Sequence, residues 1–197
     1  EIAQCLVGSE MCIRDSFKTF GIPVYLGYGL TECSPLVIGN NDRIELPDSV
    51  GVPLPGVEAK IINADASGVG EICVKGPMVM LGYYNDPEAT AEVLDEDGFF
   101  HTGDLGTVDE NGYYRITGRI KNVIVTKNGK NIYPEEVEYY LNKNPFVAES
   151  IVVGEDEDDE TMVTAKVFPN VEAIREKLKQ SSVSSEEVFK ALSNVVK

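Results

Sequence analysis

The sequence predicts an α/β and α+β fold, in which a β-rich segment bent into a distorted barrel is followed by a small α+β domain. Short β-prone runs separated by Gly, Asn and Asp follow one another from Val57 to Thr117. After Pro134 the pattern changes, because amphipathic helical stretches alternate with strand-like runs. We therefore place a boundary at Lys121, so that 17–120 belongs to the first domain and 121–197 to the second.

In the first domain, turn-forming and β-prone residues alternate at short intervals. The run 22–26 leads into Gly27-Tyr28-Gly29, which predicts a strand that ends in a functional loop. Asn111-Gly112 predicts a hairpin turn, and Pro87 predicts the first turn of a short helix. The other predicted strands are 57–62, 71–74 and 113–116. This regular spacing indicates a small antiparallel barrel or a bent sheet.

The second domain opens with a predicted hairpin, in which 122–126 and 131–132 flank Asn128-Gly129. Pro134 then begins an amphipathic helix with Glu135 in its first turn, where a carboxylate complements the helix dipole. Two strands and two helices are predicted after it, at 147–153, 161–168, 171–179 and 185–196.

The charge balance narrows the classes of ligand. The chain has 197 residues, with 33 acidic and 17 basic side chains and a formal net charge of −16. This balance disfavours a nucleic-acid binder, because neutralising phosphates needs clustered Lys and Arg. Between Glu110 and Glu135, however, every charged side chain is basic. The basic stretch is either a site for an anionic small molecule or a surface strip that balances acids elsewhere.

The cysteines and the single histidine predict no metal site. Cys5, Cys12, Cys33 and Cys73 contain no Cys-x-x-Cys pair, and His101 alone cannot complete a Cys/His zinc set. We expect free thiols and a packing role for the histidine, in a cytoplasmic protein. No apolar run approaches the roughly 18–20 residues of a membrane-spanning helix, which leaves only peripheral membrane contact open.

The segment Tyr28-Gly29-Leu30-Thr31-Glu32 carries an aromatic ring, a hydroxyl and a carboxylate at the end of a predicted strand. A ring can stack on a nucleobase, a hydroxyl can donate to a phosphate oxygen, and a carboxylate can hold Mg²⁺. The alternative interpretation is a Gly-rich turn in which Thr31 caps a helix and Tyr28 is simply buried.

Two later segments carry polar groups of the same kind. Phe100-His101-Thr102-Gly103-Asp104 is expected to be a second polar loop, and its last carboxylate can accept hydrogen bonds from both hydroxyls of a ribose or stabilise its own turn. Gly118-Arg119-Ile120-Lys121 supplies a guanidinium that can bind phosphate or ribose. A lone Arg after a strand is also a common surface residue.

In this order the segments resemble those of the adenylate-forming enzymes, the superfamily of AMP-binding acyl-CoA synthetases, luciferases and peptide-synthetase adenylation domains. The matching stretches are Tyr28–Glu32, Gly82–Thr90, His101–Gly106, Gly118–Lys121 and Asn131–Glu138. Gly27–Pro35 and Lys130–Pro134 are most similar to long-chain fatty-acid CoA ligases. By this resemblance, 17–120 is the C-terminal part of a large AMP-binding domain and 121–197 is a truncated small C-terminal domain.

The resemblance implies a two-step, ATP-dependent reaction. A carboxylate, such as that of a long-chain fatty acid, attacks ATP to give an acyl-adenylate and pyrophosphate, and the thiol of coenzyme A then displaces AMP. On the matching positions, Tyr28 lies against the adenine, Thr31 contacts the α-phosphate and Glu32 ligates Mg²⁺. Mg²⁺ and a hydroxyl donor would stabilise the charge that accumulates on the α-phosphate. Gly27 and Gly29 belong to the same nucleotide-contacting loop, and Gly27 also borders the acyl tunnel.

The remaining nucleotide contacts implied by the resemblance lie further along the chain. Asp104 holds the ribose hydroxyls, Ile116 packs beside the nucleoside, and Arg119 binds ribose or phosphate.

Three residues near the domain boundary match positions that act in the second half-reaction. Lys121 matches the hinge about which the small domain swings between the two half-reactions. Gly129 leaves room for the pantetheine arm of coenzyme A, because glycine has no side chain. Lys127 either contacts the phosphates of coenzyme A or is a solvated hairpin lysine.

Other parts of the family pattern are missing, which indicates a fragment that is inactive on its own. The phosphate-binding loop rich in Ser, Thr and Gly, expected upstream of Tyr28, has no match, nor has the C-terminal Gly-Lys, and the chain begins with Glu1. Residues 1–16 are unmatched, and Cys5–Ser16 resembles a translated sequencing-adapter string, so we interpret this segment as an artefact. A non-catalytic nucleotide-binding module and an adenylation domain that loads a carrier protein stay open as alternatives.

Overall fold

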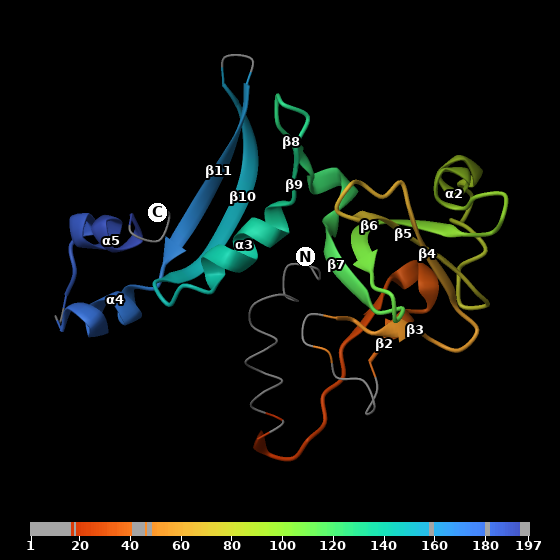
Figure 1. Cartoon of the computed structure of the whole chain (residues 1–197), viewed down its shortest axis with the longest axis horizontal. Helices are drawn as coiled ribbons and strands as arrows, with labels where there is room; N and C mark the ends of the chain where they lie inside the picture. The colour runs from red at the N-terminus through yellow and green to blue at the C-terminus, as the bar shows by residue number, and fades with distance from the viewer. Residues whose placement is uncertain are drawn as a thin grey trace. The chain divides into compact units, whose positions relative to one another are not determined.

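The computed structural model describes residues 17, 19–40, 46, 49–157, 160–179 and 182–193. The chain forms two compact units, Phe17–Lys121 and a second that includes Asn122–Lys197. Figure 1 shows the helices and strands of each unit. The division falls after Lys121, and the boundary expected from the sequence falls after residue 120. The segment Cys5–Ser16 lies outside the described residues.

The described residues of the first unit form two antiparallel sheets. The three-stranded sheet consists of β1 (Gly27–Gly29), β2 (Leu36–Gly39) and β3 (Val52–Pro53). The four-stranded sheet follows chain order, from β4 (Glu58–Ile62) through β5 (Gly70–Lys75) and β6 (Phe100–Val108) to β7 (Tyr114–Arg119). The series of short antiparallel strands predicted between Val57 and Thr117 is confirmed.

The four-stranded sheet is open, so the expected barrel does not close within the described residues. Closure would require the two outer strands, β4 and β7, to pair with each other. The outer edge of β7 is instead used by the chain just before β3. Tyr114 N donates to Gly51 O at 2.9 Å, and Val50 N donates to Tyr114 O at 3.0 Å.

The strand predicted at 22–26 lies further along the chain, because 22–26 carry no strand and β1 begins at Gly27. The glycines are therefore part of the strand. β1 pairs with β2 through an irregular register between Tyr28 and Gly29, where the carbonyl oxygen of Pro35 would lie 1.7 Å from a Cβ on Gly29. Only glycine permits this approach, so a segment that looks like a turn folds as an edge strand.

The local turn and cap signals of the first unit are confirmed. Asn111-Gly112 lies in the connection between β6 and β7, with Gly112 at φ +83° and its N–H donating to Asp109 O. Pro87 begins helix α2 (Pro87–Val93), and Asp86 Oδ1 caps this helix by accepting from Ala89 N at 3.0 Å. Both structures depend on residues close in sequence, which is why the sequence predicts them.

The core of the first unit joins both sheets, because buried side chains come from β1, β2, β5, β6 and β7. Its buried members are Tyr28, Cys33, Val37, Ile38, Ile72, Val74, Phe100 and Tyr114. Cys73 is also fully buried, and Cys33 and Cys73 are free thiols, as predicted.

Burial disfavours the reactive thiolate form of these two cysteines. It raises the pKa of Cys33 to about 11 and that of Cys73 to about 12, with nearby Glu32 and Glu71 adding to the shifts. Since the thiolate is the nucleophile, we expect iodoacetamide at pH 8 to label Cys73 about a thousand-fold more slowly in the native protein than in urea. Peptide mass spectrometry would measure both rates. Equal rates would show that the thiol is accessible and ionised.

The second unit is built on a long hairpin. It contains β8 (Ile124–Val125), β9 (Asn131–Ile132), α3 (Pro134–Asn142), β10 (Val147–Glu157), β11 (Glu160–Pro169), α4 (Val171–Leu178) and α5 (Ser185–Leu192). Helix α3 lies along the β10–β11 hairpin (Figure 1), and Glu138 Oε1 accepts from Val152 N at 2.7 Å. The α+β order predicted for this unit is confirmed. Among the described helices of the chain, none is both long and apolar enough to cross a membrane.

Candidate functional site

Three residues predicted to contact the nucleotide meet in the first unit. Tyr28 lies in β1, Asp104 in β6 and Arg119 at the end of β7. The Tyr28 hydroxyl donates to Asp104 Oδ2 at 2.7 Å, and Arg119 Nε donates to Asp104 Oδ1 at 2.8 Å. Each oxygen of the carboxylate therefore accepts one bond from the described part of the chain. A carboxylate has about four acceptor positions, so two more donors can bind to it.

Burial fixes which groups of this trio act as donors. Tyr28 and Asp104 are each 7% exposed, whereas the Arg119 side chain is 51% exposed. Burial raises the pKa of the Tyr28 phenol well above its ordinary value, and the nearby Asp104 carboxylate raises it further. Tyr28 therefore stays protonated and donates to Asp104. Arg119 brings a positive charge to the edge of the site, where an anionic ligand can reach it.

The stretch Phe100–Asp104, expected from the sequence as a polar loop, lies in strand β6, and a bulge in this strand presents the Asp104 carboxylate. Cys73 pairs with His101 and Glu71 with Leu105, so Ile72 alone lies opposite Thr102, Gly103 and Asp104. Thr102 Oγ1 donates to Ile72 O at 2.7 Å and accepts from Asp104 N at 3.0 Å. Bulges of this kind re-aim a side chain away from the regular pleat.

Thr31 and Glu32 lie on a short 3-10 helix, η2 (Thr31–Cys33), immediately after β1. The main chain of Glu32 accepts from Met80 N at 2.7 Å, and Glu32 Oε1 accepts from the Tyr83 hydroxyl at 3.1 Å. Burial and this bond raise the pKa of Tyr83, which keeps it a donor. The Tyr83 hydroxyl thereby orients the Glu32 carboxylate. An oriented carboxylate beside this exposed hydroxyl suits a hydrated Mg²⁺.

Tyr83 was not predicted as a site residue. It lies 51 positions from Glu32 in sequence, and neither residue type nor spacing links the two. The only signal was that Tyr83 falls in the Gly82–Thr90 stretch, which we matched to the family without assigning a role to any of its residues.

The other predicted site residues lie around the trio or in the second unit. Ile116 in β7 packs against the core of the first unit, and Gly27 is an end residue of β1. Lys121 is the middle residue of the 3-10 turn η3 (Ile120–Asn122), where the division between the units falls. Lys127 and Gly129 lie between β8 and β9 in the second unit, and Gly129 has φ +73°.

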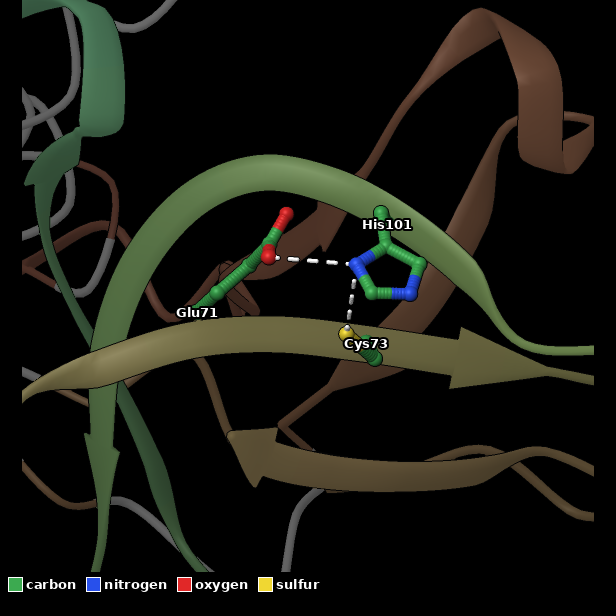
Figure 2. A group of neighbouring side chains, drawn as sticks. All are labelled: Glu71, Cys73 and His101. Carbon is green, nitrogen blue, oxygen red and sulfur yellow. Dashed lines mark hydrogen bonds and ion pairs between the residues drawn. The ribbon is translucent and has the colours of Figure 1, made fainter. Parts of the chain in front are cut away.

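A polar cluster of Glu71, Cys73 and His101 lies on β5 and β6 of the four-stranded sheet (Figure 2). One potential metal-ligand atom from each lies within 4.8 Å of the others. Glu71 Oε2 lies 3.2 Å and Cys73 Sγ lies 3.7 Å from His101 Nδ1. Metal binding would need the Cys73 thiolate, and its raised pKa disfavours that form. Within the described residues the cluster is better explained by its hydrogen bonds, and both ring nitrogens of His101 have polar partners where the sequence predicted only a packing role.

Comparison of the sequence with known proteins finds the enzyme family that the site residues suggest. The family described as AMP-binding enzyme matches residues 5–84, a range that begins within the segment interpreted as an artefact. A long-chain-fatty-acid–CoA ligase of Salmonella typhimurium is 46% identical over 134 residues, which are 65% of this chain and 24% of the ligase. A probable 4-coumarate–CoA ligase of Dictyostelium discoideum is 45% identical, over 74% of this chain and 27% of that protein.

Solved structures that resemble this chain also include a coenzyme A synthetase. The O-succinylbenzoate coenzyme A synthetase of Bacillus subtilis in complex with AMP is 30% identical, with a TM-score of 0.72, over 91% of this chain and 36% of that one. The chain thus spans about a quarter of the curated relatives and about a third of this solved structure.

Proposed function

This chain belongs to the family of AMP-binding, adenylate-forming enzymes, and from that premise we propose that it supplies the nucleotide site of an ATP-dependent acid–CoA ligase. The observation that supports this most directly is the Asp104 carboxylate, which is held by Tyr28 and Arg119 and keeps acceptor positions for two further donors. The vicinal hydroxyls of a ribose are two donors of matching spacing. In our proposal Asp104 holds the ribose of AMP and of ATP.

The neighbouring residues would act on the rest of the nucleotide. Tyr28 borders the adenine, Ile116 packs beside the nucleoside, and Arg119 binds ribose or phosphate. The Thr31 hydroxyl donates to an α-phosphate oxygen. Glu32, oriented by Tyr83, would hold Mg²⁺, which lowers the cost of negative charge on that phosphate.

The reaction we propose has two displacements. A carboxylate oxygen of the acid attacks the α-phosphorus of ATP, and the bond to pyrophosphate breaks. The sulfur of coenzyme A then attacks the acyl carbon and loses its proton, and the bond to AMP breaks. Lys121 would serve as the hinge between these steps, while Lys127 and Gly129 would contact coenzyme A.

We propose a long-chain fatty acid as the substrate, on the strength of the Salmonella ligase. The other similar proteins are named for 4-coumarate and O-succinylbenzoate, so the identity of the acid is the most specific part of the proposal. A cytoplasmic location belongs to the same proposal.

Isothermal titration of this chain with AMP tests the nucleotide site. Heat of binding with AMP, and none with inorganic phosphate, would support it. The reaction is tested on the complete protein, by following acid-dependent release of pyrophosphate and coenzyme A-dependent release of AMP over a panel of acids. AMP binding without either release would favour the non-catalytic module. Release of pyrophosphate, with the acyl group passed only to a carrier protein, would favour the adenylation domain.

The role of Glu32 predicts a specific change in metal dependence. We expect Mg²⁺ to strengthen the binding of AMP to the native chain, and Glu32→Gln to remove that enhancement while leaving the affinity without Mg²⁺ nearly unchanged. Titrations with and without Mg²⁺ measure both values. Glu58→Gln, at an exposed carboxylate on β4, is the matched control and should keep the enhancement. Full enhancement in the Glu32→Gln chain would contradict the assignment.

A further inference from the structure

The bulge that presents Asp104 leaves backbone groups without partners in the sheet. Three residues of β6 lie opposite Ile72, so the N–H groups of Gly103 and Asp104 cannot both bond to β5 in the regular way. A buried N–H without an acceptor is costly. Asp104 N donates to Thr102 Oγ1, two residues earlier in the same strand.

Gly103 N takes a different partner, the side chain of Glu71 on β5. It donates to Glu71 Oε1 at 3.1 Å. Gly103 has φ +69°, a left-handed conformation that the bulge needs and that glycine adopts without strain. The carboxylate thus binds the bulge at the residue directly before Asp104.

The Glu71 side chain is itself held in place (Figure 2). Its other oxygen, Oε2, lies 3.2 Å from His101 Nδ1, and His101 Nε2 lies 3.7 Å from Asp95 Oδ2. The Glu71 side chain is only 13% exposed, so solvent offers it few alternative partners. The two carboxylate oxygens therefore bind the two ends of one short segment, His101 and Gly103.

We propose that Glu71 is a positioning residue of the nucleotide site, which holds the β6 bulge through Gly103 N and thereby aims the Asp104 carboxylate at Tyr28, Arg119 and the ribose. His101 acts in support, because it keeps Glu71 turned toward Gly103. The ligand in this inference, AMP, rests on the proposed nucleotide site. The positioning of Asp104 by Glu71 rests on the hydrogen bonds alone.

The geometry separates this role from a metal-binding role of the same cluster. Positioning depends on the reach of the Glu71 side chain and on an oxygen acceptor, but not on Cys73. A metal site would depend on Cys73 and on the negative charge of Glu71. Variants that change one property at a time therefore distinguish the two.

The test compares Glu71→Asp, Glu71→Gln and Cys73→Ala with the native chain in two readouts. Amide hydrogen exchange by NMR reports on Gly103 N–H, and titration reports the Kd for AMP. Glu71→Asp keeps the charge but is one methylene shorter, so we expect exchange at Gly103 to become at least about ten-fold faster and Kd to rise about ten-fold. Glu71→Gln keeps the length and an acceptor oxygen. It should stay within about three-fold of the native chain in both readouts.

The Cys73→Ala chain should match the native chain in both readouts. Native exchange at Gly103 in the Glu71→Asp chain would overturn the inference, and so would native affinity for AMP despite fast exchange. Loss of AMP binding in Glu71→Gln or Cys73→Ala at native stability would favour the metal role. If the native chain itself binds no AMP, the nucleotide proposal fails first. The NMR signal of the hydrogen-bonded Arg119 Nε–H then tests whether Glu71 positions Asp104, because Glu71→Asp should weaken this signal and Glu71→Gln should not.

Discussion

Replacing Asp104 by alanine is expected to abolish measurable AMP binding and to destabilise the first unit. In the native chain, Asp104 accepts from the buried Tyr28 hydroxyl and from Arg119 Nε, and we propose that it also accepts from the ribose. Losing two charge-assisted bonds to the ribose should weaken AMP binding about 100-fold or more. The Tyr28 hydroxyl would stay buried without its acceptor, which should lower the free energy of unfolding by about 1–3 kcal/mol.

Two measurements separate these effects. Titration gives the Kd for AMP, and urea unfolding gives the free energy. Asp109→Ala is the matched control, because Asp109 also pairs with an arginine of β7, Arg115, at 3.4 Å, and lies outside the proposed site. It should lose stability through its turn contacts and keep its affinity. Asp104→Ala with native affinity would show that the ribose binds elsewhere, whatever the change in stability.

The features that could be predicted from the sequence are those whose causes lie within a few residues. Asp86 caps α2 three residues ahead of Ala89, and Asn111-Gly112 turns the β6–β7 hairpin through contacts to Asp109. These structures form because a side chain or a left-handed glycine satisfies nearby backbone groups. Local chemistry therefore recovered β4, β5, β7 and α2 of the first unit and the elements of the second unit, with errors of a few residues at the ends, but it missed β2, β3 and the long strand β6.

The site was predicted residue by residue but not as an arrangement. Tyr28 and Asp104 are 76 positions apart, and nothing in either motif indicates that the Tyr28 hydroxyl binds the Asp104 carboxylate. The same holds for Tyr83 and Glu32, and for Glu71 and Gly103. Each of these pairs depends on strand register and on the β6 bulge, which are set by how the sheet packs. Of the barrel and the bent sheet expected from the sequence, the open sheet forms for a related reason, since the edge of β7 is used by Val50 and Gly51.

Gly29→Ala is expected to be strongly destabilising, because among the described glycines an added Cβ has its shortest backbone contact here. The new Cβ would lie 1.7 Å from the carbonyl oxygen of Pro35 and 2.7 Å from its carbonyl carbon. Both atoms belong to the backbone, so no side chain can rotate to make room. The β1–β2 pair would have to separate, and Tyr28 and the η2 helix would move with it. We expect a loss of about 4 kcal/mol or more in the free energy of unfolding, or no folded protein at all.

Gly68→Ala provides the control that isolates this steric cause. Gly68 has φ +84°, yet an added Cβ meets no atom within 4 Å, so only the left-handed backbone penalty of about 1–2 kcal/mol applies. In urea unfolding, Gly29→Ala should therefore lower the free energy of unfolding more than Gly68→Ala does. The loss of a glycine, which both variants share, cannot explain this difference. Gly29 lies in the motif assigned to the nucleotide, and the Pro35 contact gives a reason for glycine there that needs no ligand. If Gly29→Ala were as stable as Gly68→Ala but failed to bind AMP, the glycine would serve the ligand, and the close β1–β2 approach would not be what requires it.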